Sequence, residues 1–223
     1  VVPHNRKTGE WTAAVNMNFG SALEYALNQG ASLMTGKKMG LDEKPAAEMT
    51  SFEEVKAAFY RQFDNLCRHS VILTVEAQRL HREMVPRPFL SSCNEHCLET
   101  GRDLSHGGAQ YNIGPVITGI GLAVVANSLA AIQKLVFEEH RCDMATLAKA
   151  LQANWNGYEE LRTAAKAAPK YGNDDDHVDG IAREIANHFY DEIHQYHDIF
   201  GSPFLTAFMG ISNYIPMGRV LGA

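Results

Sequence analysis

The fold of this chain is decided by a glycine-centred stretch, Gly107-Gly108-Ala109-Gln110-Tyr111-Asn112, and by three blocks that follow it. Gly114, Gly119 and Gly121 continue the glycine run among Ile, Val and Thr side chains. Because glycine has no Cβ, the run predicts a strand or extended loop whose backbone passes close to another segment, followed by a helix through Phe137. The further blocks are Asn127-Ser128-Leu129-Ala130-Ala131-Ile132, Pro169-Lys170-Tyr171-Gly172-Asn173-Asp174-Asp175-Asp176 and Ile215-Pro216-Met217-Gly218-Arg219.

Much of the remaining sequence has the apolar spacing of helices. A capping box, Ser51-Phe52-Glu53-Glu54, predicts the start of a long helix that runs to about Met84 and is stopped by Pro86. Residues 203–213 are rich in Phe, Leu and Thr and predict an inward-facing barrel strand. Helices separated by short extended segments indicate an α/β architecture. Further helices are predicted over residues 15–27, 91–100, 144–153, 157–167 and 175–198.

Composition excludes several classes of protein. The chain has 223 residues, 45% of them hydrophobic, and a net charge of −6 without a basic stripe, so a nucleic-acid binder is not indicated. No stretch approaches the roughly 18 consecutive apolar residues of a membrane span. Four cysteines are too few for a disulfide scaffold and fit a cytoplasmic location.

Three groups of potential metal ligands have simpler explanations. The acids Asp174, Asp175 and Asp176 lack the alternate-position ligands of a calcium loop, and are expected to cap the following helix. Cys93 and Cys97 have no second pair at zinc-finger spacing, so structural thiols are expected. His188 and Glu192 share one helical face, but His194 is rotated off it, which favours a solvated polar face.

Together, the four blocks resemble the glycyl radical enzymes, in the same order and at the same spacings. This family includes pyruvate formate-lyase, dehydratases, choline trimethylamine-lyase, arylacetate decarboxylases and the fumarate-adding benzylsuccinate and alkylsuccinate synthases. The resemblance implies a ten-stranded barrel sheathed by helices, in which a cysteine loop and a glycine loop meet at the centre. Relatives run to several hundred residues and this chain begins at Val1 without an initiator methionine. We therefore expect residues 1–223 to be an internal part of a single catalytic domain.

The resemblance also places the radical carriers. In relatives the cysteine loop commonly reads Gly-Cys-Val-Glu-Pro, and this chain opens Val1-Val2-Pro3. Aligning the prolines puts the radical cysteine just before Val1 and Val2 where the glutamate stands. The radical glycine is expected beyond Ala223, so the chain alone is expected to be inactive, with no catalytic residue of its own.

Val2 favours one reaction over the others. In eliminating and decarboxylating members the glutamate moves a proton, which valine cannot do. Addition of a hydrocarbon radical to fumarate, giving a substituted succinate, needs only hydrogen-atom transfers and carbon–carbon bond formation. We therefore expect a fumarate-adding synthase of anaerobic hydrocarbon degradation, acting on a toluene-like compound or an alkane. The alternatives are a glycyl radical dehydratase, C–N lyase or arylacetate decarboxylase, and, more distantly, a non-catalytic helical interaction domain.

Seven residues are candidates for substrate binding. Val2 and Met17 would suit a hydrocarbon, and Arg6 or Arg219 could pair with the fumarate carboxylates. Asn213, Ile215 and Met217 alternate along the late strand and share one face, which in relatives lines the substrate pocket. The simpler alternatives are surface cations for the arginines and barrel core for the strand residues.

The resemblance further implies a protein-derived glycyl radical, installed by a radical S-adenosylmethionine activating enzyme, with no bound cofactor or metal in this part. Expected partners are the small-molecule substrates, the activating enzyme, small accessory subunits and a second copy of the full-length chain as a homodimer. Neither nucleic acid nor a membrane is expected.

Overall fold

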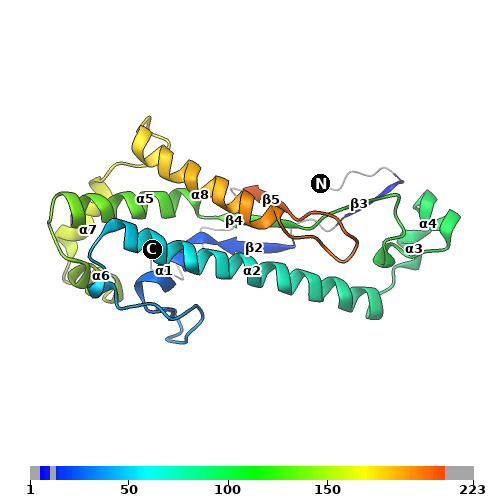
Figure 1. Ribbon diagram of the computed structural model, residues 1–223, viewed down its shortest axis with the longest axis horizontal. Coiled ribbons are helices and arrows are strands. Elements are labelled where there is room, and N and C mark those ends of the chain that lie inside the picture. The colour runs from blue at the N-terminus through cyan, green and yellow to red at the C-terminus, as the bar shows by residue number, and fades with distance from the viewer. Residues whose placement is uncertain (1–5, 11–13, 209–223) are drawn as a thin grey trace. The chain divides into compact units, whose positions relative to one another are not determined.

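The computed structural model of the protein describes residues 6–10 and 14–208. These form two compact units, each built from separate stretches of chain. The first unit contains Cys67–Gly119, Phe189–Phe208 and the described residues before position 18, and the second contains Asn18–Leu66 and Ile120–His188. The longest helix, α2 (Phe52–Met84), contributes residues to both units (Figure 1). The single catalytic domain expected over residues 1–223 stays a prediction.

Two parallel strand pairs lie mainly in the first unit. A short pair joins β1 (Thr8–Glu10) to β3 (Tyr111–Ile113) in parallel. A three-stranded sheet has the order β2 (Val15–Asn18), β4 (Val116–Ile120), β5 (Leu205–Phe208), and β4 pairs with β5 in parallel from Val116 opposite Leu205. Parallel pairing with intervening helices confirms the α/β class.

The helix predicted over residues 15–27 begins later than expected. Residues 15–18 are the strand β2, and α1 covers only Phe19–Leu27. Along β2, Asn16 is exposed and Met17 buried, which is the alternation of a strand. The side chain of Asn18 then accepts a hydrogen bond from the Gly20 N–H at 3.0 Å, so the helix starts after this cap.

The predicted start and end of α2 are confirmed. The Ser51 hydroxyl accepts a hydrogen bond from the Glu54 N–H at 3.3 Å. The Glu54 carboxylate accepts one from the Thr50 N–H at 2.6 Å, one residue before the position that the capping box predicts. Helix α2 ends at Met84, two residues before Pro86.

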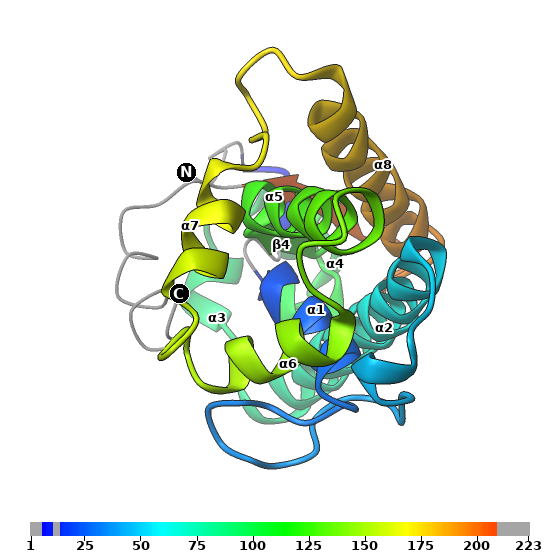
Figure 2. The same cartoon turned by 90° about the vertical axis from the view of Figure 1, so that its left-hand side faces the viewer.

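Helices dominate the second unit. Helix α1 packs on α5 (Leu122–Ile132), and α5 also contacts α7 (Glu159–Ala167), as Figure 2 shows. A π-helix, η3 (Gln133–Glu138), continues α5, and α6 (Met144–Gln152) packs on the turn η1 (Ala46–Glu48). In the core, the ring centroids of Phe19 and Phe63 lie 4.7 Å apart.

The last helix, α8 (Asp176–His194), contributes residues to both units and ends four residues before the predicted end. In the first unit, the helix predicted over residues 91–100 is two short helices, α3 (Pro88–Ser91) and α4 (Glu95–Thr100), followed by the turn η2 (Leu104–His106). None of the described helices has the length and hydrophobicity that crossing a bilayer requires.

Candidate functional site

The glycine-centred stretch lies against the segment that leads into β5. A Cβ on Gly107, whose φ is +72°, would come within 2.8 Å of the Phe200 ring. A Cβ on Gly114 would come within 1.8 Å of the Pro203 carbonyl oxygen. Side chains at these positions would therefore separate the two segments, which confirms the close backbone approach predicted from the glycines.

Asp103 organises the turn that precedes the glycine pair. Its carboxylate accepts hydrogen bonds from the N–H and hydroxyl of Ser105, the Arg87 N–H and the Ser91 hydroxyl, at 2.7–2.9 Å. Burial alone would raise the pKa of Asp103, but these hydrogen bonds outweigh it and lower the pKa to about 2. The Asp103 carbonyl accepts the Gly108 N–H at 3.0 Å, so the turn and the glycine pair are built as one piece.

Asp198 organises the turn that precedes β5. Its carboxylate accepts the N–H groups of Phe200 and Ser202, both at 2.9 Å, and the Gln78 side-chain amide at 3.0 Å. The Ser202 hydroxyl donates to the Asn112 carbonyl oxygen at 2.6 Å. These bonds hold the turn before β5 beside β3.

The second and third sequence blocks meet in the second unit. The side-chain oxygen of Asn127 accepts the Tyr171 N–H at 2.7 Å. The Lys170 ammonium donates to the carbonyl oxygens of Ala165 and Ala168 at the end of α7. The two blocks therefore hold the loop between α7 and α8 in place.

The acidic run of the third block caps α8, as predicted. The Asp175 carboxylate accepts the N–H groups of His177 and Val178 at 3.1 and 3.2 Å. Within residues 6–10 and 14–208, no group of three or more His, Cys, Asp or Glu side chains is arranged to hold a metal ion. The four cysteines are free thiols; Cys97 is buried, as is Cys67, whereas Cys93 is exposed.

Two of the predicted substrate-binding residues lie in the described part of the chain. Arg6 is exposed, and its carbonyl oxygen accepts the Glu95 N–H at 3.0 Å. Met17 is only 3% exposed, and its sulfur accepts the Cys67 thiol at 3.7 Å. The structure does not bring these two residues to a common cavity, and their substrate role stays a prediction. The other five candidates lie outside the described residues: Val2, Asn213, Ile215, Met217 and Arg219.

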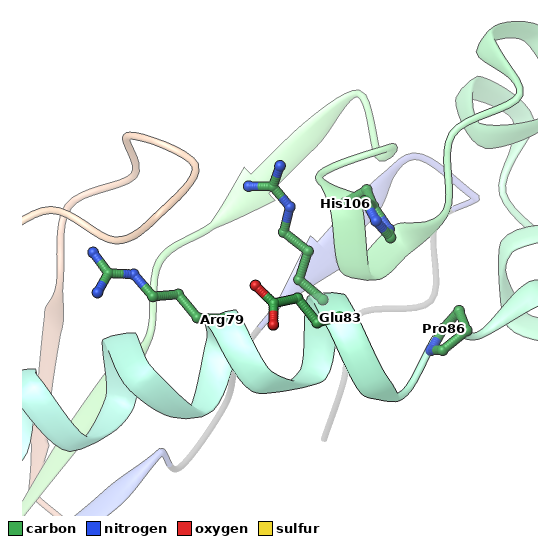
Figure 3. Close-up of a pocket in the computed structure, with 5 residues that line it drawn as sticks. Arg79, Glu83, Pro86 and His106 are labelled. Carbon is green, nitrogen blue, oxygen red and sulfur yellow. The ribbon is translucent and has the colours of Figure 1, made fainter.

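Sequence reasoning missed a surface hollow of about 630 Å³ in the first unit. Its lining comes from three places (Figure 3). Helix α2 contributes Arg79, Arg82 and Glu83, the segment after α2 contributes Pro86, and η2 contributes His106. Arg79 is already paired with Glu76 at 2.5 Å. The basic lining favours binding of an anion, but it includes no Ser, Thr or Cys nucleophile. No local sequence pattern predicts this hollow.

Comparisons with known proteins cover nearly the whole chain. The profile of the family described as "Pyruvate formate lyase-like" matches residues 3–218. Trans-4-hydroxy-L-proline dehydratase of Clostridioides difficile is 33% identical over 93% of this chain and 26% of its own length. Isethionate sulfite-lyase of Bilophila wadsworthia is 30% identical over 92% of this chain and 25% of its own length.

Two solved structures superimpose closely on this chain. The hydroxyproline dehydratase of Clostridioides difficile, with trans-4-hydroxy-L-proline bound, superimposes with a TM-score of 0.86 and 32% identity, over 96% of this chain and 27% of that one. The glycerol-bound, B12-independent glycerol dehydratase of Clostridium butyricum gives a TM-score of 0.81 and 33% identity. This overlap covers 90% of this chain and 25% of the dehydratase chain. The chain thus spans about a quarter of the length of these relatives.

Proposed function

Because this chain belongs to the pyruvate formate-lyase-like family of glycyl radical enzymes, we propose that it is part of the catalytic chain of an eliminating member. Such an enzyme removes water, or another leaving group, from a small polar substrate. The expected fold, a fragment of the glycyl radical enzyme barrel, is confirmed by the structural overlaps. Family membership argues against the distant alternative, a helical interaction domain whose glycine block only mimics the family.

One observation carries the choice of elimination. The substrate-bound hydroxyproline dehydratase overlaps 96% of this chain with a TM-score of 0.86. In the sequence comparison, trans-4-hydroxy-L-proline dehydratase is 33% identical to this chain. The other relatives reported above are a glycerol dehydratase and a sulfite-lyase. These similarities favour the dehydratase and lyase alternative over the addition of hydrocarbons to fumarate.

The described residues contribute a dry and rigid frame to this chemistry. The family's protein-derived glycyl radical supplies hydrogen-atom abstraction once it is installed. Along β4, Ile117 and Thr118 are at most 1% exposed, so the strand runs through a region closed to water. Exclusion of water protects reactive intermediates from side reactions. The Asp198 turn and Gly114 keep β5 aligned with this buried strand.

Val2 puts one condition on the proposal. A departing hydroxyl group needs a proton, and valine has none to give. If Val2 stands where relatives have glutamate, an eliminating enzyme must take this proton from another residue. Val2 is therefore the feature that favours the fumarate-adding alternative, and a decisive experiment must include both reactions.

The experiment uses the full-length parent protein with its activating enzyme under strict exclusion of oxygen. Electron paramagnetic resonance should first show an organic radical doublet. We then expect turnover of at least one polar substrate from a panel of trans-4-hydroxy-L-proline, glycerol, 1,2-propanediol and isethionate. Toluene or an alkane with fumarate is the contrasting pair. Formation of a substituted succinate without any elimination would overturn the proposal.

A further inference from the structure

The C-terminal half of α2 buries three polar side chains and leaves several large apolar side chains exposed. Ser70, Thr74 and Gln78 are 6, 3 and 1% exposed, respectively. On another side of the same helix, Leu73, Leu80 and Met84 are 65, 53 and 73% exposed. A helix of a soluble protein ordinarily has the opposite arrangement, and an exposed apolar patch commonly marks an interaction site.

The rotation of α2 about its axis is fixed by a hydrogen bond from one of the buried polar side chains to another segment. The Thr74 hydroxyl donates to the Ser70 carbonyl oxygen at 2.8 Å, within the helix itself. The Gln78 amide donates to the Asp198 carboxylate at 3.0 Å. Turning the apolar side chains inward would break the bond to Asp198 and leave a buried carboxylate without this donor, which is unfavourable. The exposure of the apolar side is therefore built into the fold of the first unit.

Three exposed apolar residues and the half-buried Ala77 have the spacing of a helix-packing seam. Leu73, Ala77, Leu80 and Met84 follow one another at intervals of four, three and four residues. This spacing places them on one stripe, which runs for about 16 Å at 1.5 Å per residue. We call these four residues the α2 stripe. Such a stripe accepts the apolar side of another helix of about three turns.

We propose that the α2 stripe is the docking site for an amphipathic helix from another part of the same parent catalytic chain. The inference rests on the proposed function, under which this chain is part of a longer enzyme. Each reported relative is similar over only about a quarter of its length, so three quarters of its polypeptide is available to supply the partner helix.

The charges beside the stripe argue against a second copy of α2 as the occupant. Glu76 and Glu83 are exposed and border one edge of the stripe. Two copies packed antiparallel would bring these like charges together, which disfavours pairing. Glu76 already has Arg79 as its partner, at 2.5 Å. The partner helix is therefore expected to carry a basic side chain opposite Glu83.

Cysteine labelling of the full-length parent tests the proposal. Leu80→Cys and Met84→Cys are made singly, with Arg82→Cys as the matched control on the opposite side of the helix. Maleimide labelling is read by mass spectrometry of the proteolytic peptide that carries the introduced cysteine, separated from the native Cys67 by cleavage after Arg68, so that native cysteines do not interfere. We expect both stripe positions to react about a hundred-fold or more slowly than the control, because a packed side chain reacts only after local opening.

Two results would overturn the proposal. Labelling of both stripe positions as fast as the control would show a free surface. Protection that disappears as the protein is diluted would show that a second copy, and not the same chain, covers the stripe. The experiment needs neither the radical nor a substrate, so its outcome is independent of the test of the proposed reaction.

Discussion

Gly114→Ala should loosen the pairing of β4 and β5 strongly. The new Cβ would lie 1.8 Å from the Pro203 carbonyl oxygen, whereas real Cβ atoms essentially never approach closer than 3.0 Å. The two segments must therefore separate by more than 1 Å. That shift would break the hydrogen bond from the Leu205 N–H to the Pro115 carbonyl oxygen, now 2.9 Å long.

The expected loss of local stability is about 3 kcal/mol. Forcing an extra methyl group into a packed site costs about 1–3 kcal/mol. Loss of the hydrogen bond adds about 1 kcal/mol. Because every 1.4 kcal/mol is a factor of ten, amide hydrogen exchange in β4 and β5 should become roughly a hundred-fold faster.

Hydrogen exchange followed by mass spectrometry measures this change in the peptides that contain β4 and β5. Gly180→Ala is the matched control, because a Cβ at this helical position has no neighbouring atom within 4 Å. It should stabilise α8 by about 0.5–1 kcal/mol. Exchange in β4 and β5 that is unchanged by Gly114→Ala would refute the close-approach argument.

Three further changes have smaller expected effects. Asn127→Ala removes the acceptor of the Tyr171 N–H and should destabilise the loop between α7 and α8 by about 1 kcal/mol, as hydrogen exchange would show; an unchanged loop would contradict it. Asp103 has a folded pKa of about 2, below its ordinary value of 3.8, so its contribution is present above about pH 4 and is lost as the pH falls through 2. After allowance for solvent screening this contribution is about 1 kcal/mol, and acid unfolding should become less steep in Asp103→Asn; identical acid profiles would exclude it. Arg6→Ala should change thermal stability by less than about 0.5 kcal/mol because this side chain is exposed, and a larger loss would reveal a buried ion pair in the parent.

Local signals made the long helices predictable. The capping box at Ser51 and the proline after Met84 define α2 because both act on the helix ends directly. The end of α8 was predicted four residues too late. The Asp198 carboxylate accepts the N–H groups of Phe200 and Ser202, which makes a turn although the helical spacing of the sequence continues to this point.

Non-local pairing explains the strand that was missed. Residues 15–18 are too few for period-two alternation to be distinguished from the start of the helix that follows. Their place in the sheet depends on β4, about a hundred residues away, and no local feature of the sequence encodes that pairing. The hollow at Arg79 and His106 was missed for the same reason, since its lining residues come from separate elements.

The shared sequence blocks explain why the family could be predicted and the reaction could not. Gly107 admits the Phe200 ring, Asn127 binds the Tyr171 backbone, and Asp175 caps α8, so the three blocks that lie in the described residues build the scaffold. A scaffold common to dehydratases, lyases and synthases cannot distinguish between their substrates. The expectation of fumarate addition depended on the single position Val2. Similarity to a dehydratase over 93% of the chain is the broader observation, and for this reason elimination is the reaction to test first.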